Sequence, residues 1–350
     1  MDIVAIDLGK FNSMCCFFDT DTQQHSFQAA ETSRSYLRSL LSSVRCDLVV
    51  MEACGPSGWI RDLCLELGLK TLVCSTNEEA WRWHNVKRKT DRDDALKLAR
   101  LAMLGQLKPV HIPKPSVREH RTLVKYRKTL DGRINRIKNS IRSLFANRGI
   151  EISRGARTWY TGREQIDGYR TPLADCEMKE LWRGQLDVEL SQLDSLTEQL
   201  ADVERRLEAI AKTDDRIRRL RTIPGVGRIT AEALATALDD PHRFQNGRQV
   251  SAYIGMVPKQ YQSGEMDRHG RITKRGPRLL RTILLECAWV SLRYNPWCRA
   301  TYDRIHGGQK TRKKKAAIAL ARKIAVVGWA MLKNEKDWDP TRMELPTKVT

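Results

Sequence analysis

Three short segments of the sequence carry carboxylates that could bind a metal ion. Asp7 and Glu52 each follow a short apolar run that is typical of a buried strand. Asp91 and Asp94 are three residues apart where a helix is expected to begin. Residues at this spacing share one face of a helix. Two strand ends and one helix could therefore bring four carboxylates to a single patch.

Four carboxylates in one patch repel each other unless cations neutralise them. Mg²⁺ or Mn²⁺ prefers such oxygen ligands, and two ions ~3.5–4 Å apart could hold the attacking and leaving oxygens of a phosphodiester. Each acid alone also has an ordinary explanation. Asp7 could belong to a turn, Glu52 could be an exposed or capping residue, and Asp91 and Asp94 could interact with the helix dipole. Their order along the chain favours the metal site.

The elements that must position these acids belong to an α/β domain, expected over residues 1–112. Short apolar runs alternate with amphipathic ones, which predicts a sheet with helices packed on it. Sites in such sheets form where buried strands end. The expected strands cover 3–6, 14–18, 47–51 and 71–74, the first two joined as a hairpin, and the expected helices cover 33–41 and 58–67.

A helical middle segment is expected over residues 113–212. A basic helix should cover 118–145, because apolar residues recur there at helical spacing among many cations. Residues 178–212 fit an apolar heptad pattern for about three heptads. This pattern predicts a coiled coil or a helical hairpin, and an ordinary core-facing helix is the alternative.

Residues 213–337 should form a mainly helical C-terminal domain with loop-rich residues 256–278, followed by a tail over 338–350. In the C-terminal domain Gly225 and Gly227 lie in the string PGVG, just before Arg228. The string resembles a helix–hairpin–helix turn, in which backbone N–H groups bind a phosphate. A plain turn between helices is the alternative.

The charge of the chain indicates a polyanionic partner. The formal net charge is +20, with 62 Lys and Arg against 42 Asp and Glu, and basic proteins of this kind commonly bind nucleic acid. A solvated basic surface is the alternative. The residues expected to contact nucleic acid, besides the PGVG turn and Arg228, are Arg127, Lys128, Arg133, Arg268, Arg271, Lys274, Arg275, Arg278, Lys313 and Lys314.

Compartment and redox signals are consistent with a cytoplasmic protein. We find no signal peptide and no apolar stretch of the ~18–20 residues that a membrane span needs. The nine cysteines include no C-x-x-C pair, so neither a zinc ribbon nor a redox motif is indicated. We expect reduced thiols.

The acidic strings IDLGK at 6–10, MEACG at 51–55 and KTDRDDA at 89–95 resemble a known family. Their order is similar to that in the RNase H-like fold of the Holliday-junction resolvase RuvC. The closer resemblance is to the DEDD insertion-sequence transposases of the IS110/IS1111 type, also described as bridge-RNA-guided recombinases. The resemblance implies that Asp7, Glu52, Asp91 and Asp94 bind the metal. Asp93 makes the last position ambiguous, and Asp94 is preferred because the family pattern is D-x-x-D followed by Ala.

The same resemblance gives a role to Ser263, which by itself would be an ordinary turn residue. The family carries a G-x-x-P…Y-x-S-G string, and Gly255, Pro258, Tyr261, Ser263 and Gly264 match it. The resemblance implies that Ser263 is a nucleophile that attacks a DNA phosphodiester. No ATP site is needed for a covalent exchange, and the chain has no G-x-x-x-x-G-K-[ST] string.

The resemblance therefore implies a transposase of a bacterial insertion sequence, associated with the nucleoid. It also implies a structured guide RNA. No RRM, KH or zinc-knuckle motif is present, so RNA would be recognised by its shape and phosphates. A homodimer or homotetramer is expected. One alternative is a RuvC-like Mg²⁺-dependent junction endonuclease that uses water as nucleophile. Another is a nucleic-acid-binding protein without enzyme activity.

Overall fold

The computed structural model describes residues 1–75, 90–263 and 266–342, and it divides into two compact units, Met1–Pro115 and Ser116–Thr350. The boundary lies close to the expected residue 112. The two long helices of the middle segment cluster with the C-terminal domain in the second unit. No helix in the described ranges is long and apolar enough to cross a membrane.

The first unit is built on a five-stranded mixed sheet with the order β3-β2-β1-β4-β5. Strand β2 is antiparallel to both β1 and β3, while β4 is parallel to β1 and β5 is parallel to β4. This is the strand order of the RNase H-like fold, so the predicted fold class of the domain is confirmed. The strands are β1 (Asp2–Asp7), β2 (Asn12–Asp19), β3 (His25–Glu31), β4 (Leu48–Glu52) and β5 (Lys70–Cys74).

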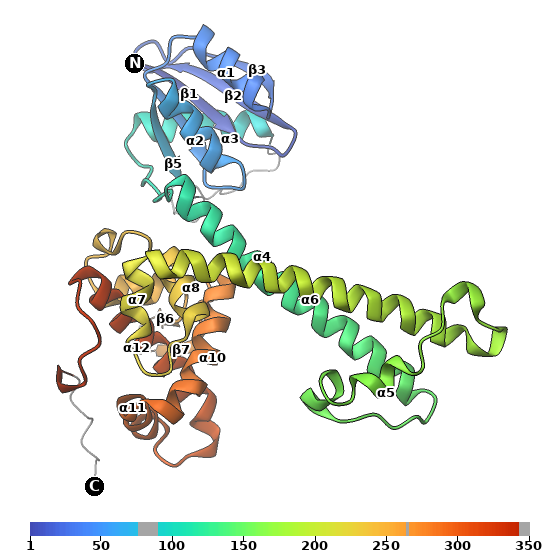
Figure 1. The fold of residues 1–350 in the computed structure, drawn as a ribbon. Coiled ribbons are helices and arrows are strands. Elements are labelled where there is room, and N and C mark those ends of the chain that lie inside the picture. Colours follow the sequence, from blue (N-terminus) through green and yellow to red (C-terminus); the bar gives the residue numbers. More distant parts are fainter. Residues whose placement is uncertain (76–89, 264–265, 343–350) are drawn as a thin grey trace. The chain divides into compact units, whose positions relative to one another are not determined.

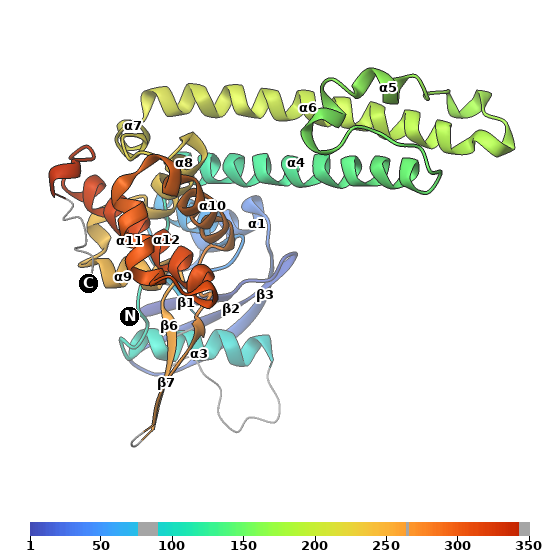
Figure 2. The same cartoon turned by 90° about the horizontal axis from the view of Figure 1, so that it is seen from below.

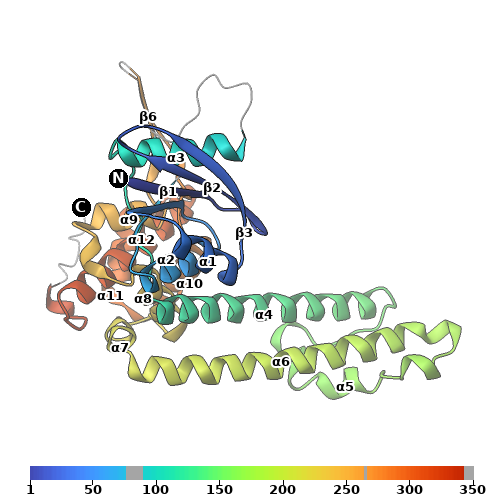
Figure 3. The same ribbon diagram turned by 90° about the horizontal axis from the view of Figure 1, so that it is seen from above.

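Helices cover both faces of this sheet (Figure 3). On one face α1 (Arg34–Ser43) and α2 (Ser57–Glu66) pack on Val4 and Ile6 of β1. On the other face α3 (Asp91–Met103) packs on the alternate residues of the same strand. Both faces are therefore buried, which explains why β1 and β4 are continuous apolar runs.

The second unit begins with two long helices that lie side by side (Figures 1 and 2). Helix α4 (Pro115–Ala146) runs outward, and α6 (Leu181–Thr213) returns beside it after a segment that contains α5 (Arg163–Asp167). The chain therefore forms a helical hairpin, one of the arrangements that the heptad pattern predicts. The apolar contact between the helices includes Ile134, Ile141 and Leu144 of α4 and Leu186, Leu190 and Leu193 of α6.

The rest of the second unit is a helical core with one β-hairpin. Its helices are α7 (Asp215–Arg221), α8 (Arg228–Leu238), α9 (Gly247–Tyr253), α10 (Arg278–Tyr294), α11 (Pro296–His306) and α12 (Lys313–Lys333). Strands β6 (Pro258–Ser263) and β7 (Met266–Ile272) pair antiparallel within the segment expected to be loop-rich. That expectation was wrong because the hairpin has little apolar alternation, the usual signal of a half-buried strand.

A network of charged side chains joins α8 to α4 and α6. The Arg228 side chain of α8 is only 12% exposed, and it lies 3.1 Å from Glu232, which is 1% exposed. It also pairs with Glu208, at 3.1 Å, and with Glu204, both on α6. Arg127 of α4 donates to Glu204 at 2.7 Å. Burial raises the pKa of the Glu232 carboxyl to about 7, against the opposing effect of Arg228.

We predict that Arg228→Ala lowers the free energy of unfolding of the second unit by about 3 kcal/mol, because it leaves the buried Glu232 without its cation. The control is Arg205→Ala, which removes an exposed ion pair with Asp202 on α6 and should change stability by less than about 0.5 kcal/mol. Urea unfolding followed by circular dichroism measures both. Equal stabilities for the two variants would contradict a structural role for this network.

Candidate active site and nucleic-acid interface

Asp7 and Glu52 lie at the ends of neighbouring parallel strands. Ile6 is paired with Met51 in the register of β1 and β4, so the two acids are the next residues on each strand. Ile3 and Ala5 of β1 pack with α3, as does Val50 of β4. Since side chains alternate along a strand, Asp7 and Glu52 belong to the α3 face of the sheet. Both are half-buried.

Helix α3 adds its acids on this same face of the sheet. Its buried residues Ala95, Leu98 and Ala99 pack on the sheet. Asp91 and Asp94 are four and one residues before Ala95, so they extend this stripe into the first turn. Asp94 is 7% exposed and Asp91 is exposed. The four acids predicted from the sequence thus belong to one face of one domain.

Asp93 has a different role, which sequence reasoning missed. Its carboxylate accepts from the backbone N–H of Thr90 at 3.0 Å, and the Thr90 hydroxyl accepts from the N–H of Asp93 at 3.3 Å. This reciprocal pair is a capping box at the start of α3. The T-x-x-D spacing is a signal that could have revealed it. The capping role of Asp93 supports the choice of Asp94 as the fourth acid of the site.

The carboxylates at the strand ends affect the pKa of two nearby cysteine thiols. Burial raises the pKa of the Cys54 thiol, and the carboxylates of Glu52 and Asp7 raise it further. Burial also raises the pKa of Cys74 to about 11, with a further contribution from Glu52. The carboxylates of Asp7 and Glu52 are therefore close enough to act on the same thiol.

The donor chemistry of this patch fits a hard divalent cation, since it consists of carboxylate oxygens. Within the described ranges, no three possible ligands are gathered into a ready-made metal site. The fit therefore rests on the pair at the strand ends and on the placement of Asp94 and Asp91 on the facing helix.

Ser263 is the last residue of β6 and is paired with Met266 at the start of β7. The next residue of the family string, Gly264, lies outside the described residues. Tyr261 is paired with Arg268 and is 58% exposed. The serine therefore lies at the tip of a hairpin in the second unit, whereas the four acids belong to the first.

Two glycines anchor the base of this hairpin. Gly255 has a φ of +70°, and a Cβ on it would lie 1.9 Å from the carbonyl oxygen of Arg275. Gly276 has a φ of +107°, and a Cβ on it would meet the carbonyl oxygen of Tyr253 at 2.0 Å. Only glycine fits such close approaches of two backbones. The match of Gly255 to the family string therefore has a structural reason.

The two glycines of the PGVG string differ in their surroundings. Gly225 has a φ of +92°, and a Cβ on it would lie 2.6 Å from the Cα of Ser291 on α10. Gly227 precedes α8, and a Cβ on it would meet nothing within 4 Å. The side chain of Arg228 is held by carboxylates, so its surroundings do not fit the expected contact with nucleic acid. Gly227 keeps an open approach.

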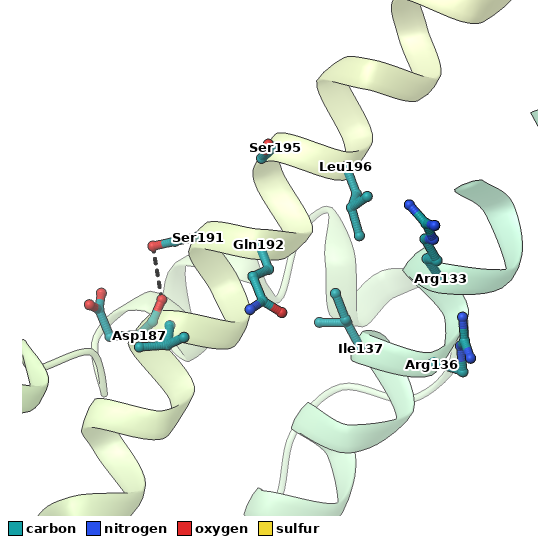
Figure 4. Close-up of a pocket in the computed structure, with 9 residues that line it drawn as sticks. Arg133, Arg136, Ile137, Asp187, Ser191, Gln192, Ser195 and Leu196 are labelled. Atoms are coloured by element: carbon teal, nitrogen blue, oxygen red, sulfur yellow. Dashed lines mark hydrogen bonds between the residues drawn. The ribbon is translucent and has the colours of Figure 1, made fainter. Parts of the chain in front are cut away.

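The other cations expected to bind nucleic acid fall into two groups. Arg127 is paired with Glu204, and Lys128 lies 3.1 Å from Asp131. Arg133 lines a pocket between α4 and α6 beside Arg136 (Figure 4). The exposed cations lie on β7, follow it or begin α12, and they are Arg268, Arg271, Lys274, Arg275, Arg278, Lys313 and Lys314.

Comparisons with known proteins agree with these observations. The sequence model of a family described as a DEDD transposase of the IS110 type matches residues 4–147, and that of the transposase IS116/IS110/IS902 family matches residues 217–303. The first match covers the four acids, and the second covers the PGVG turn and the hairpin with Ser263.

Full-length relatives extend the similarity over the chain. The transposase for insertion sequence element IS1111A of Coxiella burnetii (strain RSA 493 / Nine Mile phase I) is 28% identical over 345 residues, covering 96% of this chain and 91% of that protein. The putative transposase y4qE of Sinorhizobium fredii (strain NBRC 101917 / NGR234) is 30% identical over 305 residues, covering 84% of this chain and 72% of that protein. Among solved structures, Thermus thermophilus RuvC matches with 16% identity and a TM-score of 0.26, covering 31% of this chain and all of that one.

The RNase H-like topology and these matches define an enzyme that cuts and transfers DNA strands, a DNA transposase or recombinase. The chain belongs to the IS110/IS1111 family of DEDD transposases.

The glycines of the PGVG string offer a matched pair of variants. Gly225→Ala should destabilise the second unit by about 2 kcal/mol or more, because its Cβ would strike the backbone of α10. Gly227→Ala should keep wild-type stability and weaken binding to a duplex roughly fivefold, by obstructing the N–H groups of the turn. Thermal melting and fluorescence anisotropy separate the two effects. Full DNA affinity in a folded Gly227→Ala protein would rule out contact at this turn.

Proposed function

We propose that this transposase cuts and rejoins DNA with two sets of residues, a cation site in the first unit and a serine nucleophile in the second. The observation that carries the proposal is the placement of Asp7, Glu52, Asp91 and Asp94 on one face of the RNase H-like domain. The match to the family string at Ser263 supports the second set.

Asp7, Glu52, Asp91 and Asp94 would hold Mg²⁺, or Mn²⁺ in its place. When bound, the ion would supply positive charge beside the scissile phosphate, where negative charge develops during displacement. The protein itself would hold together carboxylates that repel each other. The apolar packing of β1, β4 and α3 would do so, because it fixes the elements that carry these carboxylates.

Ser263 would attack the phosphorus of a DNA phosphodiester. A bond forms between the serine oxygen and phosphorus, one phosphorus–oxygen bond of the backbone breaks, and the serine proton ends on the released sugar oxygen. The hydroxyl of a second strand then attacks the phosphoserine and restores the serine. The number of phosphoester bonds is unchanged, so no ATP is needed.

The exposed cations Arg268, Arg271, Lys274 and Arg275, which follow Ser263 in the chain, would hold the phosphates on either side of the cut. Besides DNA, the partner we propose is a structured guide RNA, held through its backbone by the basic surfaces of the second unit. We also propose that the protein acts as a homodimer or homotetramer at the nucleoid. The serine and the acids of one site would come from one chain or from two.

The serine step predicts a covalent protein–DNA product. Labelled DNA from the junction of the element, supplied with the flanking transcript and Mg²⁺, should give a slow, protease-sensitive band on a denaturing gel. Ser263→Ala and Asp7→Asn should both abolish the band, although both should still bind the DNA. Cleavage without any adduct, unchanged in Ser263→Ala, would instead indicate a hydrolytic nuclease of the RuvC type.

Neighbouring acids on α3 give a matched test of the metal site. Asp94→Asn should lower cleavage at least about 100-fold, because it removes a proposed cation ligand. Asp93→Asn should stay within about threefold of wild type, since an asparagine oxygen can still accept the capping hydrogen bond. Cleavage rates and Mn²⁺ binding, followed by electron paramagnetic resonance, measure both. Equal losses in the two variants would show that the metal site is wrongly assigned.

A further inference from the structure

A cleft between α4, α8 and the start of α10 is lined by none of the elements that carry the proposed catalytic residues. Its volume is about 780 Å³. This lies in the range of roughly 300–1,000 Å³ that is usual for sites that bind small organic groups, and a nucleic-acid duplex is much larger. All three helices belong to the second unit.

The wall of the cleft is apolar and made of small side chains. Ala233 and Ala237 of α8 lie on it one helical turn apart, opposite Val124 of α4 and beside Leu280 of α10. Each of these four side chains is less than 10% exposed. Such a wall can accept the flat face of an organic ring, and it offers little to a highly hydrated ion.

The rim of the cleft is cationic. Arg121, Lys125, Lys128 and Arg278 line it, and no carboxylate is among its lining residues in the described parts of the chain. Lys125 and Arg278 are exposed, and among the described residues neither has an ion pair. Among the described residues, the rim charge is paired only at Lys128, which lies 3.1 Å from Asp131 and 4.0 Å from Glu286.

Two groups in the cleft are suited to an anion. The Nε of Arg121 is buried without a hydrogen-bond partner in the described chain, while its terminal nitrogen donates to the carbonyl oxygen of Thr236. Helix α10 begins after Pro277 with no side-chain cap and no acid in its first turn. Arg121 keeps its positive charge beside the cleft, because the carbonyl to which it donates is neutral. An uncapped helix start also favours negative charge.

We infer that this cleft binds one unpaired nucleotide of a nucleic-acid strand. The base would lie against Ala233 and Ala237, and the phosphates would lie at Lys125, Arg278 and the start of α10. Apolar contact and phosphate pairing together are what an unstacked nucleotide offers, whereas a duplex keeps its bases inside. The inference rests on the DNA-transposase identity of the chain and is independent of the proposed serine mechanism.

The test measures affinity for single-stranded oligonucleotides of DNA and of RNA, and for the matching DNA duplex, by fluorescence anisotropy with the full chain. The double variant Lys125→Ala with Arg278→Ala should bind the single strand about tenfold more weakly. The slope of log binding constant against log salt concentration should become shallower by about 1.4, the value for two lost phosphate contacts. Duplex binding should weaken by about threefold or less. If the double variant loses more affinity for one of the two single strands, DNA or RNA, that strand is the source of the nucleotide.

The matched control is Arg205→Ala with Lys212→Ala, which removes the same charge from the exposed surface of α6. It should weaken single-strand and duplex binding equally and by less than about threefold. The inference is wrong if the cleft variant behaves like this control, or if its affinities for the single strand and for the duplex fall equally. Thermal melting confirms that each variant is folded.

A second variant tests the wall without changing charge. Ala237→Leu should weaken binding of a normal single strand and leave unchanged the binding of an abasic strand with the same phosphates. Equal effects on the two strands would overturn the placement of a base in the cleft. A cleft variant that keeps full single-strand affinity would overturn this inference alone, since the covalent adduct that tests the cleavage mechanism is measured separately.

Discussion

The pairing of β1 with β4 is the constraint on which the catalytic domain depends. Both strands are apolar up to their last residues and are covered on both faces, so their register is fixed by burial. A shift of one residue would move Val4 and Ile6 to the face of α3 and carry Asp7 to the opposite side. The apolar core therefore positions the two charges that the core itself could not tolerate.

In the second unit a charged network lies beside the apolar core, and Glu232 is its fully buried member. Arg228 lies among Glu204, Glu208 and Glu232 at the junction of α6 and α8, and Arg127 connects α4 to the same group. A buried cation surrounded by carboxylates is costly to separate. The paired helices α4 and α6 are thus joined to the helical core by charge as well as by apolar contacts.

Much of the first unit could be predicted from its sequence because both of its signals are local. Buried strands appear as apolar runs, and the acids follow them directly. Strand β3 was missed because Ala30 is its one buried residue. The hairpin of β6 and β7 was missed for a similar reason. The ion pairs of Arg228 with α6 could not be predicted, because Glu204 and Glu208 are about 20 residues away and no pattern around the PGVG string indicates them. The cleft at Arg121 depends on three helices that meet only after folding.

One feature of α12 affects how stability and binding are linked. Lys313 and Lys314 begin this helix, with no acid in its first turn and no side-chain cap, although the start of a helix carries partial positive charge. These like charges oppose each other in the free protein, and a bound polyanion removes the opposition. Nucleic acid bound at these proposed contacts would be a stabilising ligand of the fold, and by mass action the folded population would increase with its concentration. The free protein would then be less stable at this helix than its complex.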